Sequence, residues 1–138
     1  MTVRDVFLDT SGLYALVDRR DAHHAPARDL VARAVRQGRK LVVTDYVLPE
    51  STTLAGARGG RHVALKMLDL VDQSVGIRVE WMQPSRFDAA RAFYRRHDDH
   101  AYSFVDCASF VVMRECGLRQ ALTTDRHFVE AGFDALLA

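Results

Sequence analysis

The chain has 138 residues, of which 49% are hydrophobic and 27% are charged, and its formal net charge is +1. This length predicts one domain, spanning residues 1–138, with one buried core. The balance of 19 basic and 18 acidic side chains argues against a protein that coats nucleic acid by bulk charge, but it permits a local acidic pocket with a basic rim. No apolar run is long enough for a transmembrane helix and no signal peptide is evident, so we expect a cytoplasmic protein without a membrane partner.

Short apolar strands alternate with helices in the first half of the chain. Pro26 suits the first turn of a helix, and Gly38, Gly59 and Gly60 are typical of helix ends. In chain order we expect a strand at 6–8 ending at Asp9, a turn at 10–12, a helix at 13–17, a charged loop at 18–21, a helix from Pro26 to Gly38, a strand at 41–43, and a helix that contains Pro49 and Glu50 and is broken at Gly59.

The same alternation continues in the second half. Ser85 and Asp88 have the spacing of a capping box that opens a helix. In chain order we expect a helix at 61–75, a strand at 77–81, a helix from Ser85 to about Arg96, a nearly all-apolar helix at 103–116 stopped by Gly117, a strand at 121–123 leading to Asp125, a short helix, and an edge strand within 133–137.

This order of elements predicts an α/β fold with a parallel sheet covered by helices on both faces, because parallel strands require crossover connections. In such sheets ligands bind beyond the carboxyl ends of the strands. Four acidic residues are predicted at that edge: Asp9, Glu50, Asp106 and Asp125.

Each acid also has a purely structural interpretation. Asp9 could form an Asx turn with Ser11, Asp106 could form a capping box with Ser103, Glu50 could be a solvated helix residue, and Asp125 could cap the next helix. The joint pattern favours a site, because four independent caps need not all fall at one edge and Asp106 lies within an apolar run.

Four carboxylates gathered at one edge repel each other strongly. Two unit charges ~4 Å apart repel by about 4 kcal/mol at an effective dielectric constant of 20. A divalent cation removes that cost, and oxygen ligands select a hard ion such as Mg²⁺ or Mn²⁺. Such a site predicts phosphodiester hydrolysis, in which the ion activates water and stabilises the charge that develops on oxygen.

Four ordered motifs contain the four acids, and together they extend over essentially the whole chain. They are Val6-Phe7-Leu8-Asp9-Thr10-Ser11-Gly12, Tyr46-Val47-Leu48-Pro49-Glu50, Ser103-Phe104-Val105-Asp106-Cys107 and Thr123-Thr124-Asp125-Arg126-His127-Phe128. With these motifs the chain resembles the PIN-domain family, specifically its VapC-type toxin ribonucleases.

The resemblance implies a Rossmann-like α/β/α sandwich and a metal-dependent endoribonuclease. It maps the catalytic acids onto Asp9, Glu50, Asp106 and Asp125, with Asp9 and Asp106 as metal ligands and the other two acting directly or through water. Ser11 and Ser103 would support them. It also implies an RNA substrate, a homodimer, and a small antitoxin whose C-terminal segment covers the active-site edge.

Other polar clusters have two interpretations. His97-Asp98-Asp99-His100 could be a metal cluster, but we expect a solvated loop because adjacent side chains rarely converge on one ion. Arg58 and Arg61 flank a glycine pair and could hold RNA phosphates, or they could solubilise a helix break. Cys107 and Cys116 lie nine positions apart in one predicted helix, ~14 Å along its axis, which is too far for a disulfide.

Two other functions remain open from the sequence. The first is a non-catalytic module that binds RNA or protein. The second is an aspartate-based phosphotransfer domain, either a receiver or a haloacid-dehalogenase-type phosphatase. The second fits less well, because Ser11 occupies the position of the phosphatase's second acid, and both lysines, at 40 and 66, lie in the first half of the chain, away from the late strand where a receiver needs one.

Overall fold

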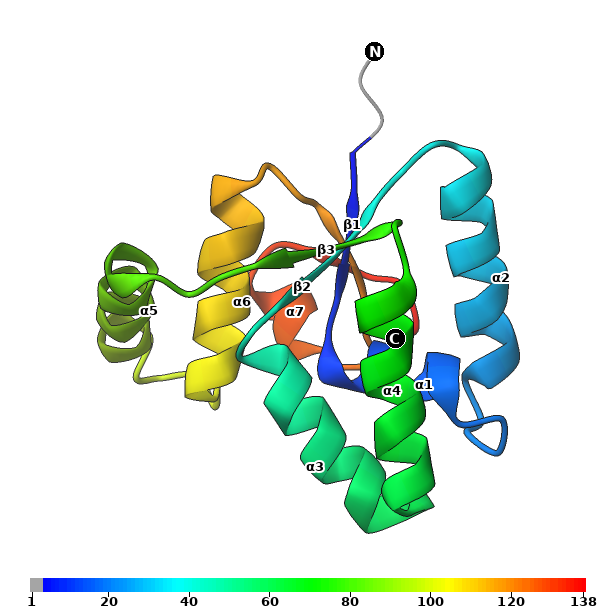
Figure 1. Cartoon of the computed structure of the whole chain (residues 1–138). Coiled ribbons are helices and arrows are strands. Elements are labelled where there is room, and N and C mark those ends of the chain that lie inside the picture. Colours follow the sequence, from blue (N-terminus) through cyan, green and yellow to red (C-terminus); the bar gives the residue numbers. More distant parts are fainter. Residues whose placement is uncertain (1–3) are drawn as a thin grey trace.

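The computed structural model describes residues 4–138, and a five-stranded sheet lies at the centre of this part of the chain (Figure 1). The strand order is β3-β2-β1-β4-β5, and all four pairings between neighbouring strands are parallel. The predicted α/β fold is therefore confirmed. The strands are β1 (Val6–Leu8), β2 (Leu41–Thr44), β3 (Ile77–Glu80), β4 (Gln120–Leu122) and β5 (Asp134–Ala135).

Helices cover both faces of the sheet, as parallel strands require. Figure 1 shows α5, α6 and α7 on one side of the sheet and α1, α2 and α4 on the other. The helices are α1 (Thr10–Val17), α2 (His24–Arg36), α3 (Val47–Gly59), α4 (Arg61–Gln73), α5 (Pro84–Arg96), α6 (Phe104–Glu115) and α7 (His127–Glu130).

The central strands β1 and β2 are buried along their whole length. Phe7 of β1, Phe110 of α6 and Phe128 of α7 are fully buried, and the rings of Phe110 and Phe128 meet edge to face with centroids 5.0 Å apart. This aromatic packing positions α6 and α7, the two helices that carry acidic residues 106 and 125 at or just before their first turns.

Two local predictions were wrong. Residues 10–12 are the first turn of α1 rather than a separate turn, since α1 begins immediately after Asp9. Ser85 and Asp88 form no capping box, because Pro84 occupies the first turn of α5 and the helix begins after Gln83. Asp88 instead pairs with Arg91 at 3.2 Å.

Gly12 allows α1 to lie directly against the end of β4. A Cβ atom at this position would stand 1.9 Å from the carbonyl oxygen of Leu122. No side chain fits there, so glycine brings the first turn of α1 into contact with the carboxyl end of β4. This contact sets the spacing of the acidic residues that follow β1 and β4.

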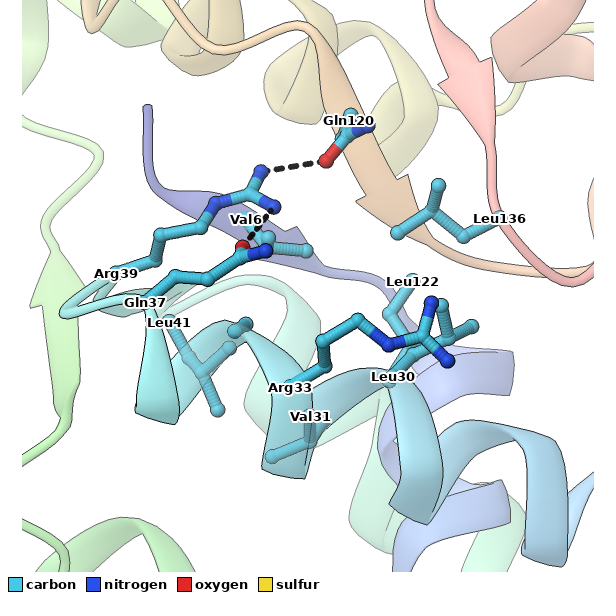
Figure 2. Close-up of a pocket in the computed structure, with 11 residues that line it drawn as sticks. Val6, Leu30, Val31, Arg33, Gln37, Arg39, Leu41, Gln120, Leu122 and Leu136 are labelled. Atoms are coloured by element: carbon cyan, nitrogen blue, oxygen red, sulfur yellow. Dashed lines mark hydrogen bonds between the residues drawn. The ribbon is translucent and has the colours of Figure 1, made fainter. Parts of the chain in front are cut away.

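A cavity of about 190 Å³ lies between α2 and the sheet (Figure 2). Both apolar and polar side chains line it, and Arg39 donates a hydrogen bond to Gln120 across it. Val6, Leu41 and Gln120, which begin β1, β2 and β4, line it. The cavity therefore lies at the amino ends of the strands, away from the acidic edge.

Within residues 4–138, no helix is both long and apolar enough to cross a membrane. Cys107 and Cys116 are free thiols, in agreement with the predicted spacing.

Candidate active site

The acidic residues gather where β1 and β4 end. These strands are neighbours in the sheet, but the chain leaves them in opposite directions, toward β2 from β1 and toward β5 from β4. Such a switch point opens a crevice beyond the strand ends. Asp9 follows β1 directly, and Asp125 follows β4 by three positions.

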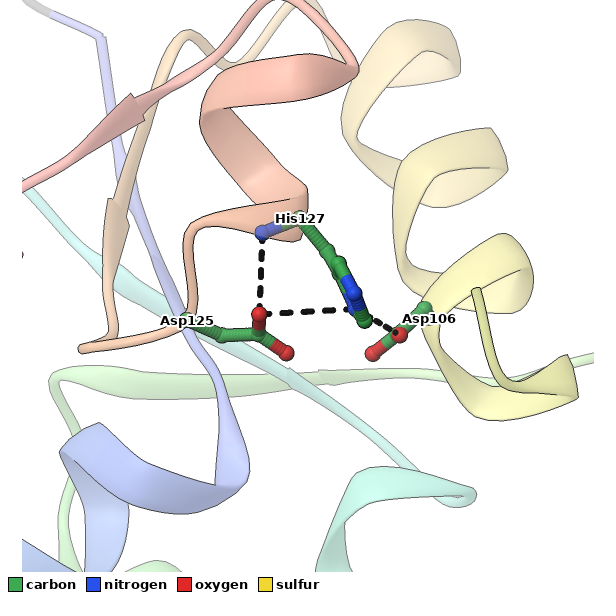
Figure 3. Close-up of side chains that lie close together, drawn as sticks. All are labelled: Asp106, Asp125 and His127. Carbon is green, nitrogen blue, oxygen red and sulfur yellow. Dashed lines mark hydrogen bonds and ion pairs between the residues drawn. The ribbon is translucent and has the colours of Figure 1, made fainter. Parts of the chain in front are cut away.

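Asp106, Asp125 and His127 form the centre of the site (Figure 3). Each offers one ligand atom, and these atoms lie within 4.8 Å of one another. Nδ1 of His127 lies 3.1 Å from Oδ2 of Asp106 and 3.4 Å from Oδ1 of Asp125. Burial alone would lower the pKa of His127, but the hydrogen bond to Asp106 and the charge of Asp125 outweigh it and raise that pKa. The imidazole therefore offsets part of the negative charge.

A capping box at the start of α6 holds Asp106 in place. The Asp106 backbone N–H donates to Oγ of Ser103 at 3.0 Å, and the Ser103 N–H donates to Oδ2 of Asp106 at 3.0 Å. The Asp106 side chain is 13% exposed. The structural interpretation of this motif is thus correct, and the same box also aims the carboxylate at His127.

Asp9 is the most deeply buried acid of the group, with 6% exposure. Burial raises its pKa to about 7, the charges of Asp106 and Asp125 add to the rise, and a hydrogen bond from Thr123 opposes it. Asp9 does not cap α1 with its side chain, so its Asx-turn interpretation was wrong. Within residues 4–138, no basic side chain lies within ion-pair distance of Asp9. An ionised Asp9 would therefore need a positive partner from outside the chain.

The hydroxyl of Thr123 connects β1 to the loop after β4. It donates to Oδ2 of Asp9 at 2.7 Å and accepts from the backbone N–H of Asp125 at 3.0 Å. Oγ of Ser11 lies 3.1 Å from the same hydroxyl and accepts from the N–H of Thr124. Ser11 thus supports the site by ordering this loop.

Glu50 lies in the first turn of α3 and is exposed. It is not part of the three-residue centre formed by Asp106, Asp125 and His127. Its Oε1 accepts a hydrogen bond of 2.9 Å from Oγ1 of Thr10, the residue after Asp9. This bond holds the start of α3 against the start of α1. Asp125, for its part, accepts the N–H of His127 at 2.9 Å, so its predicted contact with the short helix is also present.

Three contributors to the site carried no predicted role: His127, Thr123 and Thr10. His127 and Thr123 lie in a motif that carries the family resemblance, but only the pairing of β1 with β4 reveals their contacts. The position of His127, two residues after a strand-end acid and first in a helix, is the one signal the sequence offers.

The structure separates the other candidates from this centre. Arg58 lies over the ring of Tyr14, whereas Arg61 lines a groove on another side of the α3–α4 pair. In the His97–His100 loop, His100 pairs with Glu130 at 3.0 Å and His97 stacks on Phe93. Among residues 4–138, the His/Asp/Glu/Cys group close enough to share one metal ion lies at Asp106, Asp125 and His127 and does not include this loop.

The donor set fits a small divalent cation. Asp106 and Asp125 place hard carboxylate oxygens close together, and Asp9, with its pKa raised to about 7, is coupled to both. Carboxylate oxygens are the ligands that Mg²⁺ and Mn²⁺ prefer. The acidic cluster can therefore bind a metal ion.

Comparisons with known proteins agree with this geometry. The family model described as "PIN domain" matches residues 6–134. The 23S rRNA-specific endonuclease VapC20, from two Mycobacterium tuberculosis strains, CDC 1551 / Oshkosh and H37Rv, is 35% identical over 128 residues, covering 93% of this chain and 95% of the relative. The crystal structure of Mycobacterium tuberculosis VapC20, a sarcin-ricin loop cleaving toxin, superposes with a TM-score of 0.83 and 34% identity, covering 94% of this chain and 96% of that one. The chain therefore belongs to the PIN-domain family.

Proposed function

We propose that the protein is a metal-dependent endoribonuclease, the toxin of a toxin–antitoxin pair. The observation that carries this proposal is the gathering of Asp9, Asp106 and Asp125 at the carboxyl edge of β1 and β4, where burial, with the charges of Asp106 and Asp125 added to it, raises the pKa of Asp9 to about 7. Membership of the PIN-domain family supports the same activity.

In this proposal Asp9 and Asp106 hold the cation, and Glu50 and Asp125 complete the site directly or through water. A bound Mg²⁺ or Mn²⁺ supplies charge stabilisation and an activated water. Thr123 holds the carboxylate of Asp9 through its hydroxyl, and Ser103 holds that of Asp106. His127 donates to Asp106 and limits the repulsion between Asp106 and Asp125.

Ribosomal RNA is the substrate class we propose to test first. The relative VapC20 is named as specific for 23S rRNA, and the identity with it extends over 93% of this chain. We propose that the protein meets this substrate in the cytoplasm.

We further propose two protein partners, an antitoxin and a second copy of the chain. Phe87 and Tyr94 on α5 are exposed and pack with Phe104 of α6 through centroid distances of 5.3 and 5.9 Å. An exposed aromatic cluster is typical of protein interfaces. Light scattering of the purified chain tests the dimer: a monomer mass at micromolar concentration contradicts it.

Cleavage of purified 23S rRNA tests the proposed activity. We expect fragments with Mg²⁺ or Mn²⁺, none with a chelator, and none with Asp9→Asn. Asp88→Asn, a change of the same chemistry on the exposed surface of α5, is the control and should cleave normally.

Two outcomes would overturn the proposal. RNA binding without metal-dependent cleavage would indicate a binding module, and an acyl phosphate formed from a small phosphodonor would indicate phosphotransfer. Activity retained in Asp9→Asn would refute the assignment of the site.

A further inference from the structure

A group of cationic side chains lies at the corner where the end of α1 meets the turn between α3 and α4, in the lower part of Figure 1. Two adjoining hollows, of about 310 and 410 Å³, share Asp18 and Arg20 in their walls. We call the cationic residues around them the basic corner. Its members are Arg19, Arg20, Arg58, His62 and Lys66.

The cations of the basic corner are mostly without acidic partners. Arg20 lies 3.5 Å from Asp18 and is 73% exposed. In the part of the chain that the structure describes, Arg19, Arg58 and Lys66 lie within ion-pair distance of no carboxylate. All three are exposed. Their positive charge therefore faces solvent.

The two acids in the hollows, Asp18 and Asp21, are fewer than the cations and accept hydrogen bonds from the protein itself. Asp18 is 7% exposed and accepts hydrogen bonds from the Tyr14 hydroxyl at 2.5 Å and from the Arg20 N–H at 2.9 Å. Asp21 accepts the N–H of His23 at 2.8 Å. Four permanent cations, Arg19, Arg20, Arg58 and Lys66, therefore face two carboxylates, which leaves the corner with a net positive charge and a net attraction for anions.

The ends of α1 and α3 and the start of α4 pack closely against one another at the basic corner. A Cβ atom on Gly59 would stand 3.2 Å from Oδ2 of Asp18 and 2.8 Å from Cγ2 of Val63. Glycine therefore lets α3 end against the carboxylate that follows α1. The positive φ of 93° at Gly60 then turns the chain into α4, which brings His62 and Lys66 to the same hollow.

The same two helices connect the basic corner to the acidic edge. α1 starts beside Asp9 and ends at Asp18, and α3 carries Glu50 in its first turn and Arg58 in its last. Thr10 contacts Glu50, and one turn later Tyr14 lies beneath Arg58. The axial separations are ~6 Å along α1 and ~12 Å along α3.

We propose that the basic corner binds the phosphate backbone of the RNA substrate within a few nucleotides of the bond that is cut. The corner lies only ~6 Å farther along α1 and ~12 Å farther along α3 than the contact of Thr10 with Glu50, so a backbone lying across the acids reaches it over a short length. Arginine suits bidentate contacts to phosphate, and such contacts position RNA without reading its sequence. This inference rests on the proposed function, because the basic corner would hold the RNA that the acidic site cuts.

Charge reversal tests this surface. The variant Arg19→Glu/Arg58→Glu/Lys66→Glu removes the three cations that lack carboxylate partners. The control Arg33→Glu/Arg36→Glu/Arg119→Glu reverses three exposed arginines around the amino ends of the strands. Thermal melting of both variants establishes that they fold.

The binding measurement uses a fluorescent, mixed-sequence, unpaired RNA and proteins that also carry Asp9→Asn, so that nothing is cut. We expect the basic-corner variant to bind at least about tenfold more weakly and the control to bind nearly as the parent does. The slope of log K against log salt should fall in magnitude by roughly 0.7 for each phosphate that the variant no longer neutralises.

The cleavage measurement uses 23S rRNA and proteins with Asp9 intact. We expect the basic-corner variant to raise KM with little change in kcat, because the corner contacts the strand away from the scissile bond. Unchanged binding and an unchanged KM in a folded variant would overturn the proposal.

Two further results have distinct meanings. Polyglutamate that binds the parent and not the variant, with RNA binding unaffected, would assign the corner to an acidic polypeptide and overturn the proposal. A parent protein that binds RNA through the corner but cuts none would refute the proposed activity and leave this inference standing.

Discussion

The carboxyl group of Asp9 carries the largest electrostatic cost of any single group in the site. Burial and the charges of Asp106 and Asp125 raise its pKa from 3.8 to about 7. A group whose folded-state pKa is raised contributes stability at low pH that is lost as pH rises through the folded value. The metal-free protein should therefore lose stability between about pH 4 and pH 7 and remain at the lower level above it.

Asp9→Asn should remove this dependence. Without metal, we expect the variant to be more stable than the parent above pH 7, by roughly 2–4 kcal/mol, and to lose that advantage near pH 4. Urea unfolding at several pH values with a chelator measures the difference. A constant difference from pH 4 to pH 8 would show that the carboxyl group does not titrate in this range.

The hydroxyl of Thr123 contacts three parts of the site: the Asp9 carboxylate, the Asp125 backbone N–H and the Ser11 hydroxyl. Thr123→Val keeps the shape but leaves Asp9 without its donor and the Asp125 N–H without its acceptor. We expect a loss of roughly 1–3 kcal/mol in unfolding free energy, together with reduced RNA cleavage. Thr123→Ser, which retains the hydroxyl, should restore most of both. Equal damage from the two variants would assign the effect to packing instead.

At the scale of elements, α1 and β4 approach each other so closely at Gly12 that no side chain fits between them. Gly12→Ala would place a Cβ atom 1.9 Å from the Leu122 carbonyl oxygen. Because backbone atoms occupy the space, we expect a loss of roughly 3 kcal/mol or more and a displaced Asp9.

Gly56→Ala is the matched control. Gly56 lies in α3, and a Cβ atom there would meet nothing within 4 Å. We expect it to gain about 0.5–1 kcal/mol, since alanine loses less entropy than glycine in a helix. Denaturant unfolding of both variants compares them, and similar stabilities would contradict the close packing of α1 against β4.

Most elements were predictable because local signals were strong. The apolar runs at β1, β2 and β4 and the glycines at 38, 59, 60 and 117 mark their positions in the sequence. The first turn of α1 was not predictable, because Thr10 and Gly12 are residues typical of turns, and the reason for glycine is a strand 110 positions away. Pro84 likewise fixed the start of α5 one residue before the false capping box.

The acidic site was predictable only in part. Strand ends indicated that Asp9, Asp106 and Asp125 would share an edge, and that edge does bring them into electrostatic contact. The order of the strands in the sheet cannot be predicted from any single segment of the sequence, so the hydrogen bond from Thr123 to Asp9 could not be foreseen. Nor could the sequence show that the turn at Gly60 sends Arg58 and Arg61 to different surfaces.

For the molecule as a whole, metal binding should be visible as stability. A ligand that binds only the folded state at a concentration one hundred times its Kd stabilises it by about 2.7 kcal/mol. We expect Mg²⁺ or Mn²⁺ to raise the melting temperature of the parent and of Asp88→Asn, and to leave that of Asp106→Asn nearly unchanged. An equal shift in all three proteins would indicate binding elsewhere.

The pairing of β1 with β4 has a consequence for protein synthesis. Asp9 is translated early, but Asp125 and His127 must also leave the ribosome before they can lie beside it. A nascent chain that ends before residue 120 has β1 without β4 beside it, and one that ends before residue 127 holds only part of the acidic group. The site is therefore complete only when nearly all of the chain has emerged from the ribosome, so catalysis has to wait until translation is almost finished.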